Sequence, residues 1–514
     1  MTVIGRVVAV SGSQVVATIS EDAGSAERVE KGQLVKIPLP QTHAFAIVSA
    51  LSIPMPDTPV RLMELALVGE CRHRGDGGRF HRGLSAYPAL GDPVLAIEPR
   101  DLAAIRGAEG PETIPLGALH RGSGRIVHVD PDRLLGRHFA VLGATGSGKS
   151  CAVASILHTL VERGTQAHIL VLDPHGEYAS AFRDRAVVLG QDNLELPYWL
   201  LTGEELVEVV GGGRDPGPQR AAELLLDFVA RAKGAYRDAN GDHRPAVDAP
   251  VPYRLSDVIR LIDEVVGRLD RTESVAAYRW LKNRLEILSR DPRFAFLFGG
   301  IAVRDDMARI LGTLFRIPAD GRPITVVDLS GIPNEVLEVV VSVLLRLAFD
   351  LAYWSRGRIP VLILCEEAHR CAPSDKSRGF APTRLAMARI AKEGRKYGVA
   401  LGLVSQRPSD LEPSVLSQCG TVLAFRVTSP HDQELVHALL RDDANGLLDF
   451  LPSLGDGEAI VLGQAVPFPV RLQFPELSSE LRPRRASPSF SRPESAEEDP
   501  IELLESLVRA WRRR

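Results

Sequence analysis

The chain has 514 residues, of which 45% are hydrophobic and 25% charged, and its formal net charge is −4. This length exceeds that of a single hydrophobic core, so we expect two or more domains. The mildly acidic net charge excludes a uniformly positive protein, so DNA binding would need local basic residues. The sequence has no apolar run of ~20 residues and no secretion signal, which predicts a cytoplasmic protein without a membrane span.

The five cysteines form an odd set without the paired spacing of a zinc site. Because disulfides are rare in the reducing cytosol, we expect free thiols and neither a disulfide frame nor a metal site. These residues are Cys71, Cys151, Cys365, Cys371 and Cys419.

Residues 1–105 consist of short β-branched runs separated by glycines and prolines. This pattern is typical of a small antiparallel barrel, which we expect to serve as an assembly domain. The predicted strands include Val3–Val10, Gln14–Ile19, Gln33–Ile37 and Ala46–Ala50.

Apolar runs alternate with helical segments from about Arg137 onward, which predicts an α/β core with a mostly parallel sheet. We expect this core in two parts, residues 106–202 and 307–476, with a helical insertion at 203–306 between them. The predicted core strands are Phe139–Leu142, His168–Leu172, Ile324–Leu329, Val361–Leu364, Ala400–Val404 and Thr421–Phe425.

The end of the chain changes in composition. Residues 477–499 are rich in Pro, Ser and Arg, which predicts a disordered linker. Residues 500–514 place apolar side chains on one face of a helix. This helix could dock on a partner or a neighbouring subunit, act as a basic nucleic-acid tail, or pack on its own domain.

A glycine-rich loop follows the first core strand and matches G-x-x-x-x-G-K-[ST] in full. Glycines let the backbone N–H groups turn inward toward phosphate oxygens, and the next helix adds its positive N-terminal end. Lys149 would reach the β- and γ-phosphates of ATP, and the Ser150 hydroxyl would bind Mg²⁺. The loop comprises Gly143, Ala144, Thr145, Gly146, Ser147, Gly148, Lys149 and Ser150.

Three apolar strands end in an acid and compete for the second ATPase motif, those ending at Asp173, at Asp328 and at Glu366. The last has two adjacent acids, and hydrolysis needs one carboxylate near Mg²⁺ and another to polarise water. We therefore expect Glu366 to act on the metal and Glu367 on the water, although Asp is commoner at the first position. Solvation of an ordinary strand end is the alternative.

Asp173 and Glu177 lie in the turn Asp-Pro-His-Gly-Glu-Tyr that follows a core strand. This edge of an α/β sheet binds ligands, so the two acids could hold Mg²⁺ waters or relay the nucleotide state. The alternative is a capped turn, because Pro-His-Gly is good turn chemistry.

Polar residues also flank the strand that ends near Val404. Gln406 follows it and could hydrogen-bond the γ-phosphate and sense its loss. Arg395 precedes it and could be an arginine finger offered to the nucleotide of a neighbouring subunit. The alternative for Arg395 is a basic residue on a solvated helix end.

Together these motifs resemble the HerA family of hexameric ATPases, within the wider group that includes FtsK-type DNA pumps. The resemblance covers roughly residues 1–475 and implies a RecA-like core and a homohexamer with duplex DNA in its pore. It also implies a nuclease partner, or an effector enzyme in anti-phage defence. The matching motifs are residues 135–150, 173–178, 366–370, 393–398 and 405–409.

By this resemblance Lys149 and Ser150 take the P-loop roles, Glu367 that of the catalytic acid and Gln406 that of the sensor. Arg395 becomes the finger in trans, and Arg137 could also face the nucleotide. Two other functions remain open. One is an ATP-gated ring scaffold that activates an effector enzyme, and the other is a secretion-type pump, which the lack of a membrane anchor disfavours.

Overall fold

The computed structural model describes residues 2–20, 29–54, 60–72, 80–98, 100–101, 113–120, 125–211, 219–234, 245–268, 275–299, 305–439, 446–484 and 500–511. The chain divides into two compact units. Unit 1 contains residues 1–171 and 345–482, and unit 2 contains residues 172–344 and 483–514.

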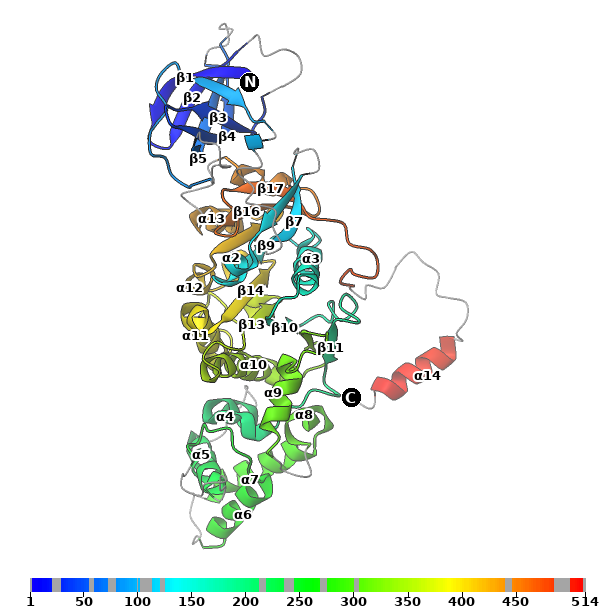
Figure 1. Cartoon of the computed structure of the whole chain (residues 1–514). Coiled ribbons are helices and arrows are strands. Elements are labelled where there is room, and N and C mark those ends of the chain that lie inside the picture. Colours follow the sequence, from blue (N-terminus) through cyan, green and yellow to red (C-terminus); the bar gives the residue numbers. More distant parts are fainter. Residues whose placement is uncertain are drawn as a thin grey trace. The chain divides into compact units, whose positions relative to one another are not determined.

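Unit 1 begins with a closed antiparallel barrel, shown in blue in Figure 1, with the strand order β1-β2-β5-β4-β3-β6. Its inward-facing side chains, such as Ile4, Val15 and Val35, are fully buried. This confirms the predicted N-terminal barrel. The strands are β1 (Val3–Ser11), β2 (Gln14–Ile19), β3 (Leu34–Pro38), β4 (Thr42–Ser52), β5 (Leu62–Arg72) and β6 (Pro93–Ala96).

The larger sheet of unit 1 has the strand order β10-β13-β14-β9-β15-β16-β17-β7-β8. The pairs β13–β14, β14–β9 and β9–β15 are parallel, whereas the pairs from β15 to β8 are antiparallel. The strands are β7 (Ile114–Leu119), β8 (Ile126–Val129), β9 (Phe139–Leu142), β10 (His168–Asp173), β13 (Val361–Cys365), β14 (Val399–Ser405), β15 (Thr421–Ala424), β16 (Glu458–Gly463) and β17 (Val470–Gln473).

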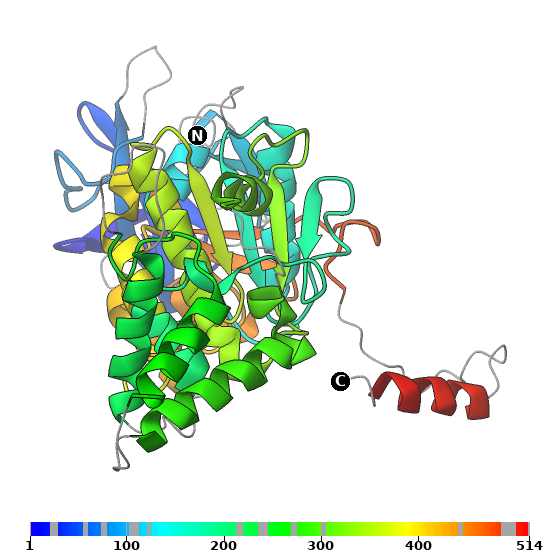
Figure 2. The same cartoon turned by 90° about the horizontal axis from the view of Figure 1, so that it is seen from below.

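The parallel strands are apolar throughout because both of their faces are covered. Every residue of β9, β13 and β14 is buried, and helices lie on both sides of these strands, with α3 on one side and α11 on the other (Figures 1 and 2). This confirms the predicted α/β core. The helices of unit 1 include α2 (Pro131–Leu135), α3 (Lys149–Glu162), α11 (Ala381–Tyr397), α12 (Pro413–Leu416) and α13 (Pro430–Leu439).

Unit 2 contains the parallel pair β11 (Ala186–Leu189) and β12 (Ile324–Asp328), and a group of helices in which α5, α6 and α7 pack on one another. The strand β10 ends in this unit, and α10 (Asn334–Trp354) runs from it into unit 1. Its helices include α4 (Gly203–Gly211), α5 (Gln219–Lys233), α6 (Leu255–Val266), α7 (Val275–Arg290), α8 (Ala295–Phe298) and α9 (Met307–Phe315).

The C-terminal segment contains the expected amphipathic helix, α14 (Pro500–Trp511). Its apolar side chains Ile501, Leu504 and Leu507 are exposed to solvent. Of the linker predicted at 477–499, residues 485–499 lie outside the described part of the chain. Within the described ranges no helix is both long and apolar enough to cross a membrane, and no group of side chains suits a metal ion by itself. The five cysteines all lie in these described ranges and form no disulfide there.

Candidate functional site

The carboxyl ends of three neighbouring parallel strands meet at one edge of the sheet in unit 1. The register pairs Cys365 of β13 with Leu403 of β14, and Ser405 of β14 with Leu142 of β9. The glycine-rich loop follows β9, the acid pair follows β13, and Gln406 follows β14. Three motifs far apart in the sequence therefore lie together at the edge where α/β sheets bind ligands.

Two glycines of the loop occupy positions that no other residue could take. Gly143 and Gly148 have φ angles of 151° and 102°. A Cβ at Gly143 would lie 2.7 Å from the Cβ of Phe425, and one at Gly148 would lie 2.8 Å from the backbone nitrogen of Gly457. The loop is therefore glycine-rich because it packs tightly as well as because it turns.

Backbone hydrogen bonds fasten the loop to the neighbouring strands. The N–H of Ala144 donates to Arg426 O at 2.7 Å, and the N–H of Gly457 donates to Ser147 O at 2.9 Å. The Ser147 side chain is fully buried and its hydroxyl donates to Ala144 O at 2.7 Å. The loop is thus held in shape by the protein itself, as a preorganised binding site requires.

The residues of this loop suit the binding of a nucleoside triphosphate. The helix α3 starts at Lys149 behind a glycine cap that has no side chain, and its first turn contains no acidic residue. Its positive N-terminal end therefore faces the loop without a competing carboxylate. The Lys149 ammonium is largely buried and donates to Ala144 O at 2.9 Å, which places a positive charge inside the loop.

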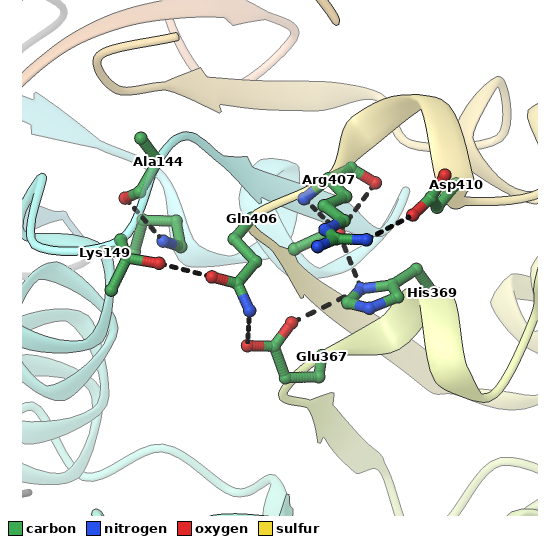
Figure 3. Close-up of polar contacts among 9 residues, drawn as sticks. Ala144, Lys149, Glu367, His369, Gln406, Arg407 and Asp410 are labelled. Carbon is green, nitrogen blue, oxygen red and sulfur yellow. Dashed lines mark hydrogen bonds and ion pairs between the residues drawn. The ribbon is translucent and has the colours of Figure 1, made fainter. Parts of the chain in front are cut away.

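Gln406 joins the loop to the acid pair, as Figure 3 shows. Its amide nitrogen donates to Glu367 Oε1 at 2.6 Å, and its amide oxygen accepts a hydrogen bond from the Thr145 hydroxyl. A single side chain thus touches both the phosphate-binding loop and a buried carboxylate. The structure brings together the sequence-predicted residues Thr145, Glu367 and Gln406.

Glu367 is held in an unusual backbone conformation. It has φ 50° and ψ 46° and is only 6% exposed, between the end of β13 and the 3₁₀ turn Ala368–Arg370. A non-glycine residue in the left-handed region costs about 1–3 kcal/mol and is found mostly where function requires it. Glu366 is equally buried, so neither acid is an ordinary solvated strand end.

A second network, which the sequence did not reveal, supports Glu367 from the other side. His369 Nδ1 lies 3.3 Å from Glu367 Oε2 and 3.2 Å from Ser405 Oγ. The Ser405 hydroxyl donates to Arg407 O at 3.1 Å, so it accepts from His369, which places the imidazole proton on Nδ1. Burial lowers the pKa of His369 and favours this neutral form, although Glu367 acts in the opposite direction. The sequence feature that could have revealed this network is the histidine two residues after Glu367.

Arg395 lies at the opposite edge of the sheet from the glycine-rich loop. It occupies the last turn of α11, just before β14 begins, whereas Gln406 follows the end of that strand. The seven residues of β14 separate the two edges by roughly 20 Å. The structure therefore does not bring Arg395 to the loop of its own chain.

A cleft of about 800 Å³ contains Arg395 at that opposite edge. Arg137, which precedes β9, lines the same cleft, together with Lys392 of α11. All three side chains are exposed. The predicted finger and the residue before the first core strand thus share one positively charged hollow.

Asp173 and Glu177 belong to unit 2. The carboxylate of Asp173 is fully buried and accepts from the N–H groups of His175 at 3.2 Å and Tyr178 at 2.8 Å. Burial raises its pKa, and the neighbouring Asp328 adds to that effect. These contacts are those of a turn cap. A role for the two acids toward the nucleotide stays a prediction.

Comparison with known proteins bears on the same site. The family model described as "Helicase HerA, central domain" matches residues 114–348. The DNA double-strand break repair helicase HerA of Pyrococcus furiosus is 29% identical over 424 residues, which cover 73% of this chain and 71% of that protein. The chain is thus similar to HerA helicases over most of its length.

Other known proteins show the same similarity. The helicase HerA of Sulfolobus acidocaldarius is 26% identical over 422 residues, which cover 77% of this chain and 75% of that protein. Among solved structures, VirB4 of Thermoanaerobacter pseudethanolicus matches with a TM-score of 0.53 at 16% identity, over 73% of this chain and all of that chain. That likeness supports the RecA-like fold alone. The chain is a P-loop ATPase.

Proposed function

We propose that this chain is a member of the HerA family that forms a homohexameric ring in the cytoplasm and uses ATP hydrolysis to translocate double-stranded DNA. One observation carries the proposal, namely that Gln406 contacts Thr145 of the P-loop and Glu367 at the same time. A γ-phosphate that enters the loop would compete for the Gln406 amide. Binding and loss of that phosphate would then move a side chain in direct contact with the proposed catalytic acid.

In this proposal the loop holds ATP and Mg²⁺. Lys149 leaves Ala144 O for the β- and γ-phosphate oxygens, and the Ser150 hydroxyl binds Mg²⁺. Glu366 would act on the same ion, because carboxylate oxygens are ligands that Mg²⁺ prefers. Asp173 and Glu177 would order the waters around the ion or report the nucleotide state.

Glu367 is the proposed catalytic acid that polarises the attacking water. His369 presents a neutral N–H near one carboxylate oxygen, and Gln406 donates to the other. The Gln406 amide orients the carboxylate, and the neutral imidazole of His369 adds no full positive charge beside it. Gln406 would sense the γ-phosphate and release Glu367 for the reaction.

Arg395 is the proposed arginine finger for the nucleotide of a neighbouring subunit. Support comes from its position, because a side chain at the far edge of its own sheet can meet a P-loop only if the subunits contact head to tail. Arg137 shares its cleft and would face the same nucleotide. Such an arrangement is a heterologous interface, which forms a ring when the rotation between successive subunits closes.

Two relatives are named as DNA double-strand break repair helicases, which favours DNA as the substrate. The net charge of −4 means that DNA would have to be held by local basic residues, such as those that line a pore. A nuclease, or an effector enzyme of anti-phage defence, is the proposed partner.

The decisive experiment measures ATP turnover by purified protein with and without linear duplex DNA. We expect duplex DNA to raise the rate several times over, and Lys149→Ala to abolish both the basal and the stimulated rate. A streptavidin block on a biotinylated duplex end should be displaced only in the presence of ATP. Turnover without any response to DNA would contradict the translocase and favour the ATP-gated scaffold.

A further inference from the structure

His138 lies buried between Arg137 and the first residue of β9 and is only 3% exposed. Its φ of 53° lies in the left-handed region, so the chain turns sharply at this residue. The buried ring and the exposed Arg137 side chain thus leave the backbone at neighbouring positions. Neither the P-loop nor the acid pair uses His138.

Two hydrogen bonds fix the ring of His138. The N–H of Leu401 in β14 donates to Nδ1 at 2.9 Å, and Nε2 lies 3.1 Å from Ala391 O in α11. Because Leu401 can only donate, Nδ1 carries the lone pair and Nε2 carries the proton that goes to Ala391. Burial lowers the pKa of His138 and keeps the ring in this neutral form, although its hydrogen bonds to α11 act in the opposite direction.

Ala391 is the residue before Lys392 and lies one helical turn before Arg395. Residues four apart in a helix lie on the same face, so the carbonyl that His138 holds is close to the helix position of Arg395. Arg137 is held as well, because the N–H of Gly420 donates to its carbonyl at 2.6 Å. A Cβ at Gly420 would lie only 2.7 Å from that of Arg137.

We infer that His138 is a positioning residue that holds Arg137 and Arg395 at one spacing, so that both guanidinium groups close on a single polyphosphate. The inference rests on the proposed function, because this polyphosphate is the nucleotide of a neighbouring copy of the chain. The ring ties the turn before β9 to the last turns of α11. Two arginines at a fixed spacing can bind several phosphate oxygens at once, which a single flexible cation cannot do.

Two substitutions at His138 test its hydrogen bonds to Leu401 and to Ala391 separately. In His138→Gln the longer side chain can place its NH₂ group where Nε2 lies, so it can still donate to Ala391 O. In His138→Asn the shorter side chain can accept from Leu401 but does not reach α11. His128→Gln, in β8 and outside the cleft, is the matched control for replacing a histidine of the same unit.

We expect His138→Asn to lower kcat by roughly ten- to a hundredfold, since displacement of a reacting group by about 1 Å can cost that much. The Kd of a fluorescent ATP analogue should change little, because the P-loop of each subunit is intact. His138→Gln and His128→Gln should each keep kcat close to that of the unchanged protein. Added to Arg395→Ala, His138→Asn should cause little further loss, because no pair of guanidinium groups is then left for His138 to hold at that spacing.

Several outcomes would overturn the inference. They are an unchanged kcat in His138→Asn, a full additional loss in the Arg395→Ala background, or a fall in kcat of folded His138→Gln as large as that expected for Asn. If His138→Asn does not fold, the kcat of folded His138→Gln still tests the inference. Failure of the proposed function looks different, because the ATP turnover of the unchanged protein would then not respond to duplex DNA, whichever residue stands at position 138.

Discussion

The Glu367 carboxylate contacts Gln406 on one side and the His369 imidazole on the other. Neither neighbour adds a full positive charge beside the carboxylate, because Gln406 carries a neutral amide and burial lowers the pKa of His369. At a site with two adjacent acids, these contacts favour Glu367 over Glu366 as the proposed acid that polarises the attacking water. They also explain why its backbone is held in a left-handed conformation that costs free energy.

The first prediction concerns Glu367. Glu367→Gln keeps the shape of the side chain but removes the base, so we expect ATP binding to persist and turnover to fall by about 10²–10⁴. Isothermal titration with ATP and Mg²⁺, alongside a phosphate-release assay, would check both parts. The exposed Glu434→Gln, on α13, is the control. Equal losses of binding and of hydrolysis would mean that Glu366 or another acid is the base.

Among the elements, the N-terminal barrel depends on a buried ion pair. The Lys36 ammonium in β3 is fully buried and lies 2.6 Å from Asp101 Oδ2, beyond the end of β6. Asp101 also accepts from the N–H of Glu98 at 2.8 Å. The pair therefore ties the chain that leaves the barrel to a strand in its wall.

Asp101→Ala would leave the Lys36 charge buried without its partner. Loss of one member of a buried pair costs about 3–5 kcal/mol, so we expect the barrel to open more readily. Amide hydrogen exchange in β3 and β4 would measure this, because unfolding of the whole chain is not a two-state process. The double variant Lys36→Met with Asp101→Ala should recover most of the protection. No change in exchange for Asp101→Ala would show that the pair contributes nothing.

For the whole molecule, the separation of the P-loop edge from the Arg395 edge predicts sharing of sites between subunits. Arg395→Ala should lower turnover by on the order of 10³. A mixture with Lys149→Ala should recover part of the rate, because about a quarter of head-to-tail interfaces in a random ring would then combine an intact loop with an intact finger.

Native mass spectrometry would check this mixture by showing assemblies of six 55.8-kDa chains that contain both variants. A ring that mixes subunits but recovers no activity would contradict the finger in trans. Particles that never exceed one chain, with full ATP turnover, would contradict the ring itself.

Much of the fold could be predicted because the pattern of apolar residues along the sequence indicates which side chains are buried. The continuous apolar runs of β9, β13 and β14 predicted strands covered on both faces, and their observed bounds differ from the prediction by no more than one residue at either end. The antiparallel strands β16, β17, β7 and β8 were not predicted. Each of them contains at least one residue that is partly or fully exposed, which weakens the apolar signal.

The sequence by itself determined the phosphate-binding loop, because the glycines, the lysine and the serine act on phosphate through local backbone geometry. It also placed Glu367 and Gln406 at strand ends. Only the tertiary structure decided that these two side chains touch, that His369 and Ser405 support the acid, and that Arg395 lies at the opposite edge beside Arg137. Such contacts join residues that are far apart in the chain, and their distances depend on strand order and register, which no local pattern encodes.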